Sequence, residues 1–324
     1  MPNTWVREFG KSVAYRVFDL AHLEHLATRR GVAHIMNLHR VHPEPSPYWP
    51  PIHPDDLDWL IRRLKRLGTF VDIREVAAVP VIDRARIFAL SFDDGYADYL
   101  EFALPVLESH GVPSNLNVIA DSVLSGQPIW SARLYEALAG IEGDRVSIIN
   151  DLMPEMPVGH LTGSPEHIGF GISNHLRRLP LTERILAIEA IEAISKHDKR
   201  RLRALTIAEV KALPSSVHVG AHGGTHEPMT AASIDEFLDD FAMCRDLFQN
   251  HLCLPLTTYA FPLGGYRQDQ VDVLLREGVS QVLVVDELAT RGGIPLLPRL
   301  TVGGTAKGQY LVKSVGASTR LGGR

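Results

Sequence analysis

The sequence has few cysteines, no long hydrophobic run and no excess of basic residues. Cys244 and Cys253 are the only cysteines among 324 residues. One pair cannot build a disulfide framework, so we expect a reducing compartment. No run of eighteen apolar residues occurs, which argues against a transmembrane segment. Lys and Arg total 33 against 38 Asp and Glu, a balance that argues against nucleic acid as a partner.

The start of the chain also lacks the features of a secretory signal. It has no basic region followed by an apolar core and a small-residue cleavage site, so we expect a cytoplasmic protein. Residues 5–28 carry apolar side chains at near-helical spacing. This pattern predicts a helical extension over residues 1–30 that packs on the outside of the fold, with peripheral membrane contact as the alternative.

From residue 31 onward, short apolar runs alternate with amphipathic helical patterns. Helices are expected from Pro54, after capping boxes at Thr206 and Ser233, and over residues 267–277. Strands are expected at 34–38, 87–92, 115–119, 217–221, 257–261, 281–285 and 296–302. Alternating strands and helices predict a parallel sheet, and a closed α/β barrel is the simplest arrangement. The polar and apolar residues that alternate in 115–119 predict a strand with one solvent-exposed face.

Residues 125–204 interrupt this alternation. They contain prolines and helical patterns but no clear strand. We therefore predict one domain over residues 31–324, with 125–204 as a largely helical insertion at the mouth of the barrel.

Residues suited to catalysis follow the apolar runs in three segments. Asp93 and Asp94 are adjacent carboxylates before a glycine, an arrangement that is costly unless a cation or hydrogen-bond donors compensate it. His222 and His226 are four residues apart around a glycine pair, a spacing that can direct two imidazoles at one point. The third segment, 259–266, ends an apolar run in Pro-Leu-Gly-Gly. Helix caps and structural histidines are the alternatives, but the combination favours a functional site.

In this order, the three segments resemble the signature of the polysaccharide deacetylase (NodB-homology, carbohydrate esterase) family, over roughly residues 31–302. The resemblance implies a distorted (β/α) barrel and a metal-dependent hydrolase that removes an N-acetyl or other acyl group from a sugar. The partner would be an acylated sugar or glycan precursor, with a role in cell-surface polysaccharide biosynthesis. The absence of an export signal favours a nucleotide- or lipid-linked precursor over an extracellular polymer.

The resemblance also assigns roles to individual residues. Asp93 would be the general base, while Asp94, His222 and His226 would bind the metal. Two imidazoles and one carboxylate suit Zn²⁺ and leave Co²⁺, Ni²⁺ or Fe²⁺ open. The backbone N–H of Leu263 would face the developing oxyanion.

Three positions depart from the family pattern. Gly223 stands where Ser or Thr is usual, so the loop loses a side-chain hydrogen bond but no ligand. Ala260 stands where many members carry an arginine that orients the base, and Arg299 is the candidate replacement from another strand. No histidine follows His251 to act as a late general acid. His39, at the end of the first expected strand, resembles a permuted version of that acid, with a structural histidine as the rival.

Two other functions remain open at this point. The same site could hydrolyse another non-peptide C–N bond, such as a ureide or a formyl amide. The chain could also be a catalytically inactive sugar-binding relative, because the usual arginine and late histidine are missing. The retained aspartates and histidines argue against the second alternative. Composition does not indicate an oligomeric state.

Overall fold

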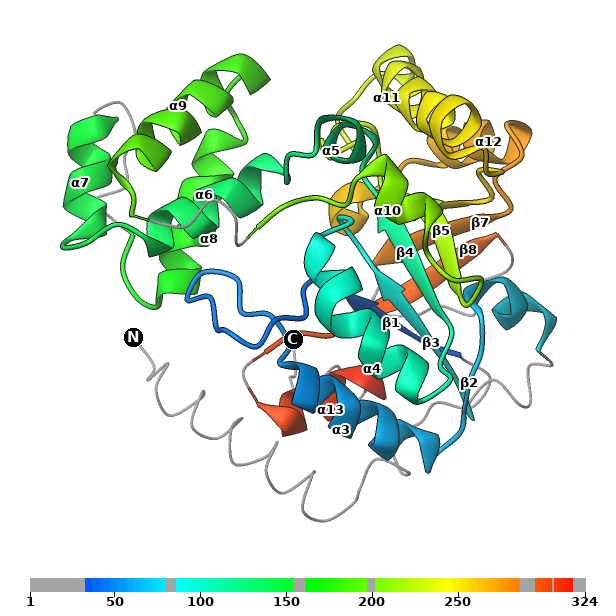
Figure 1. Ribbon diagram of the computed structural model, residues 1–324. Coiled ribbons are helices and arrows are strands. Elements are labelled where there is room, and N and C mark those ends of the chain that lie inside the picture. Colours follow the sequence, from blue (N-terminus) through cyan, green and yellow to red (C-terminus); the bar gives the residue numbers. More distant parts are fainter. Residues whose placement is uncertain are drawn as a thin grey trace.

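Seven parallel strands close into a barrel with helices around its outer surface (Figure 1). The computed structural model describes residues 33–79, 86–153, 161–196, 202–285, 295–304 and 306–316, so the helix expected in residues 5–28 lies outside them. The strands are β1 (His34–Leu38), β2 (Thr69–Phe70), β3 (Ile87–Phe92), β4 (Ser114–Val118), β5 (Val217–Ala221), β6 (Thr258–Ala260), β7 (Gln281–Val285) and β8 (Leu296–Thr301). Their order is β1-β8-β7-β6-β5-β4-β3, and β1 pairs again with β3 to close the ring. The distorted α/β barrel expected from the sequence is confirmed.

Strand β2 is missing from the sequence-based expectation. It pairs with the first two residues of β3, beside the closed ring. Two residues are too few to show the period of two that identifies a strand in a sequence.

The helices begin where local signals place them. α3 starts at Pro54, and the ring of His53 accepts a hydrogen bond from the backbone N–H of Asp55. Both expected capping boxes, at Thr206 and Ser233, are present. The helices are α3 (Pro54–Lys65), α4 (Leu104–Ser109), α5 (Ala120–Ser125), α6 (Trp130–Ala139), α7 (Arg145–Leu152), α8 (Pro165–Leu176), α9 (Leu181–Ile194), α10 (Ile207–Lys211), α11 (Ile234–Asp246), α12 (Gln268–Arg276) and α13 (Lys307–Ser314). None of these described helices is long and apolar enough to cross a bilayer.

Successive residues of each strand face opposite sides of the barrel wall. Met36 and Phe88 belong to the large core between strands and helices, whereas Ile35 and Ala89 belong to a small apolar cluster with residues of β6, β7 and β8. Above that small cluster, toward the carboxyl ends of the strands, the interior becomes polar. The buried polar residues there are Asn37, Ser91, Asp93, Asn117 and Arg299.

The exposed face expected for residues 115–119 is wrong. Asn115 and Asn117 are both fully buried. Asn115 accepts a hydrogen bond from the Ser91 hydroxyl, and the Asn117 amide donates to Ser91 and Asp93. Closure of the barrel turns this face into the interior, where neighbouring strands supply hydrogen-bond partners in place of water.

The described residues of 125–204 form helices α6 to α9 and contain no strand. In Figure 1 these green helices gather beside the barrel, away from most of its strands. They share an apolar cluster of their own, built around Leu134, Ile172 and Ile188. Arg133 forms a bidentate pair with Glu192 and so joins α6 to α9. The domain limits at residues 31, 125 and 204 stay predictions.

Candidate active site

The carboxyl ends of the barrel strands surround a cavity of about 400 Å³. Asp93 and Asp94 follow β3, and His222 follows β5. In a parallel barrel these strand ends meet at one rim, which is why segments far apart in the sequence share one cavity. Helices α6 and α8 form the opposite wall of the cavity.

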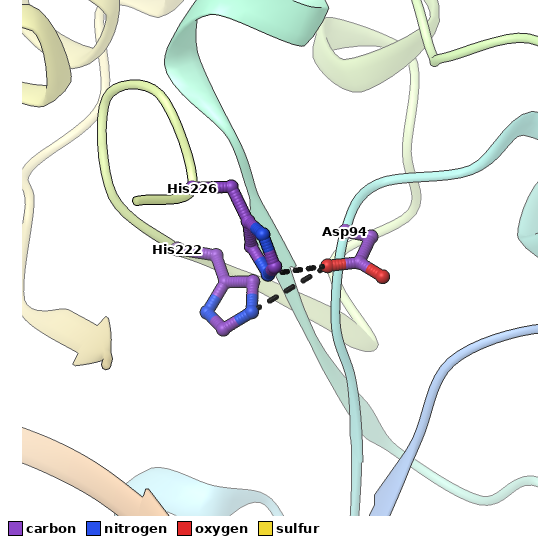
Figure 2. Close-up of side chains that lie close together, drawn as sticks. All are labelled: Asp94, His222 and His226. Carbon is purple, nitrogen blue, oxygen red and sulfur yellow. Dashed lines mark ion pairs between the residues drawn. The ribbon is translucent and has the colours of Figure 1, made fainter. Parts of the chain in front are cut away.

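Three side chains that line this cavity point toward one another (Figure 2). Asp94 Oδ1 lies 3.5 Å from His222 Nε2 and 3.4 Å from His226 Nε2. The three ligand atoms all lie within 4.8 Å of one another. A tetrahedral site with bonds of about 2.1 Å spaces its donor atoms about 3.4 Å apart, so this arrangement fits a metal such as Zn²⁺.

The hydrogen bonds and burial of the three residues also suit a metal ion. His222 Nδ1 lies 2.9 Å from the carbonyl oxygen of Ala260, to which it can donate, leaving Nε2 as the lone-pair nitrogen. Burial lowers the pKa of His226 to about 4, so its imidazole is neutral at pH 7. Asp94 Oδ1 is buried and has no hydrogen-bond partner among the described residues. An oxygen in that position is costly unless a cation is present.

Asp93 is held as an oriented carboxylate beside this triad. Its Oδ1 accepts hydrogen bonds of 2.7 Å from Arg299 Nη1 and from the Asn117 amide. Its Oδ2 lies 3.7 Å from His222 Nε2, on the side of the candidate metal ligands. Burial is the largest single influence and raises the pKa of Asp93, but the Arg299 guanidinium together with His222 and His39 outweighs it, so the pKa lies well below its usual value. Arg299, on β8, therefore contacts Asp93, as expected of a residue that replaces the usual arginine from another strand. Its role in catalysis stays a prediction.

Strained backbone marks this rim of the barrel. Asp94, His226 and Leu263 have φ values of 74°, 62° and 58°, which side-chain-bearing residues rarely adopt. Such strain persists only where the surroundings impose it, and it is common at functional sites. Gly223, with φ 77°, is placed similarly, and a Cβ there would meet Pro262 Cγ at 2.9 Å. The loop therefore requires glycine where Ser or Thr was expected from the resemblance.

Leu263 and His39 lie on the same cavity. The Leu263 side chain is half exposed at the mouth. His39 packs edge-to-face with Trp49, with ring centroids 5.5 Å apart. The next residue, Arg40, pairs at 2.8 Å with both Asp98 and Glu136 and anchors the segment that carries His39. The catalytic roles of both residues stay predictions.

Two residues of the site escaped sequence reasoning. Asn117 orients Asp93, and Asp240 on α11 organises the histidine loop. The Asp240 carboxylate accepts hydrogen bonds from the backbone N–H groups of Gly224 and Thr225 and from the Thr225 hydroxyl. Asp240 could have been noticed as a charge on the apolar face of its helix, three residues after the buried Phe237.

The fold is that of solved polysaccharide deacetylases. IcaB of Ammonifex degensii aligns with a TM-score of 0.57 over 89% of this chain and 98% of its own, at 17% identity. The deacetylase PplD of Streptococcus pyogenes gives 0.51 over 88% and 97% at 15% identity. A polysaccharide deacetylase of Bacillus cereus gives 0.51 over 87% and 68% at 10% identity. No family model and no curated protein matches the sequence.

We expect His226→Ala to lower the metal content of the purified protein, because two remaining ligands hold a divalent ion weakly. His251→Ala is the matched control and should leave the metal content unchanged, since the His251 ring contacts Asp246 and does not line the cavity. Elemental analysis gives the stoichiometry. Full occupancy in His226→Ala would remove this residue from the site.

Asp240→Ala should weaken metal binding by about 10-fold or more, because the donors that hold the histidine loop lose their acceptor. Asp239→Ala changes the same charge on an exposed neighbouring position and should have no effect. Competition with a fluorescent chelator measures the dissociation constant. Equal affinities for the two variants would show that the loop does not depend on Asp240.

Proposed function

We propose that the protein is a metal-dependent hydrolase that removes an N-acetyl or related acyl group from a sugar or glycan. The observation that carries this proposal is the convergence of Asp93, Asp94, His222 and His226 at one cavity of a barrel with the polysaccharide deacetylase fold. The acetate bound to PplD, a solved protein of the same fold, is the product expected of such a reaction.

The metal supplies one part of the chemistry. Asp94, His222 and His226 would hold a divalent cation such as Zn²⁺, which would polarise the acyl carbonyl and lower the pKa of water toward neutrality. Asp93 takes the proton of the attacking water through Oδ2, since Arg299 and Asn117 occupy Oδ1. The backbone N–H of Leu263 donates a hydrogen bond to the carbonyl oxygen as negative charge develops on it. A preorganised donor of this kind stabilises the transition state by about 3–4 kcal/mol.

The amine leaves as a neutral molecule only if its nitrogen gains a proton. His39 lines the cavity together with Asp93 and Leu263, and is the candidate for this general acid. Arg40 supports this role, because its two ion pairs hold the neighbouring backbone in place.

The arrangement of Asp93 favours catalysis over simple sugar binding. An inactive relative has no need for a buried carboxylate with one oxygen held by two donors and the other facing the metal ligands. A ureide or formyl amide remains the second candidate substrate, since the same steps cleave it. A place in surface polysaccharide biosynthesis and a cytoplasmic location stay predictions.

The test is hydrolysis by metal-loaded protein of N-acetyl sugars, formyl amides and ureides, measured as release of acetate, formate and ammonia. Asp93→Asn keeps shape and hydrogen bonding but cannot take a proton. We expect kcat to fall by about 100- to 10,000-fold while the metal stays bound. Full activity of Asp93→Asn would assign the base to another residue, and no turnover in the whole panel would contradict the proposed function.

His39→Ala should leave metal binding intact and lower kcat for an amide by about 100-fold or more. An acid must be protonated to act, so the variant should also lose the fall in rate at alkaline pH. An activated ester should suffer much less, because its leaving oxygen needs little protonation. His167→Ala, on the adjoining cavity, is the control. Equal losses on amide and ester would make His39 structural.

A further inference from the structure

Charged side chains line both walls of the catalytic cavity, and Arg40 on the barrel side pairs with Glu136 on α6. Beside this pair, the barrel wall carries Asp93, Asp94 and the histidines, whereas the helical wall carries Asn174 on α8, Arg177 directly after α8, and Ser131 on α6. Asn174 lies three residues before Arg177 and so shares its side of the helix. Arginine, amide and hydroxyl are all hydrogen-bond donors.

Arg177 lacks the carboxylate partners that Arg40 and Arg299 have on the barrel side. Arg40 is paired with Asp98 and Glu136, and Arg299 with Asp93. No carboxylate among the described residues lies within ion-pair distance (4.0 Å) of Arg177, and its buried Nε has no hydrogen-bond partner there. Burial lowers the pKa of Arg177, and the more distant Tyr135 and Glu227 offset this only in part.

The surroundings of Arg177 add to this deficit. Its guanidinium lies 5.6 Å from the centre of the Trp130 ring, and that of Arg184 lies 4.7 Å from the same ring. Arg184 already holds Glu227, the acidic side chain nearest to both. Two neighbouring guanidinium groups that share one carboxylate carry a net positive charge, which an anionic ligand would neutralise.

We infer that Arg177 binds an oxyanion, a phosphate ester or a carboxylate, on the same sugar substrate whose acyl group reaches the metal-binding residues. A guanidinium matches either group with two parallel N–H···O bonds. The two walls line one cavity of about 400 Å³, so the anionic group and the acyl group would belong to a single bound molecule. This inference rests on the proposed function for the substrate and extends it to anionic sugars.

A place at the end of α8 offers a different explanation for a cation, because helix C-termini favour positive charge. Arg178 separates the two explanations. It has the same charge, is exposed at the same helix end and lines neither this cavity nor the adjoining one. Arg178→Gln is therefore the matched control for Arg177→Gln.

The experiment measures binding of glucose, glucose 1-phosphate and glucuronate to the full-length protein by calorimetry at low salt. None of these probes has an acyl group, so none is consumed. We expect one or both anionic sugars to bind at least 10-fold more tightly than glucose, with the preferred anion identifying the phosphate or the carboxylate. Added salt should weaken that preference.

Arg177→Gln should abolish the preference for anionic sugars, and Arg178→Gln should keep it. Arg177→Lys should keep part of it, because lysine retains the positive charge but not the two parallel N–H donors of the guanidinium. Binding to a metal ion is common to all variants and cancels in the comparison. Equal affinities for neutral and anionic sugars, or an unchanged preference in Arg177→Gln, would overturn the inference. Since the readout is binding, a failure here is distinct from an absence of hydrolysis, which would contradict the proposed function.

Discussion

The contact between Arg299 and Asp93 is the interaction on which the site depends. Both side chains are almost completely buried, and a buried charge without a partner costs several kcal/mol. Arg299 lies on β8 and Asp93 follows β3, with β1 between the two strands in the barrel. The contact therefore crosses the interior and exists only because the sheet closes. It helps to keep Asp93 ionised and leaves the other carboxylate oxygen on the side of His222, one of the proposed metal ligands.

The histidine loop depends on backbone geometry as much as on its ligands. Asp94 and His226 occupy left-handed conformations that their side chains disfavour. Asp240 receives three hydrogen bonds from the loop, and Gly223 allows it to pass Pro262. The strain is offset by contacts outside the triad, so α11 takes part in building a site that it does not enter.

Two ion pairs between the helical insertion and the rest of the chain each lie directly beside a proposed functional residue. Arg40, which follows His39, pairs with Glu136 on α6. Glu227, which follows His226, pairs with Arg184 on α9. The insertion therefore does more than cover the mouth. These ion pairs help to set its position relative to the general-acid candidate and to a proposed metal ligand, and Arg177 lies on the same cavity as the proposed metal ligands.

The sequence by itself determined the order of strands and helices, the barrel, and the segments that carry Asp93, Asp94, His222 and His226, because periodicity, caps and motif spacing are local properties. Only the tertiary structure decided which polar residues meet. The solvent-facing strand expected at 115–119 became interior when the barrel closed, and Asn117 gained its role there. Asp240 and the unpaired Arg177 likewise acquire meaning from neighbours distant in the chain. Burial and charge compensation depend on these long-range contacts, which no local pattern records.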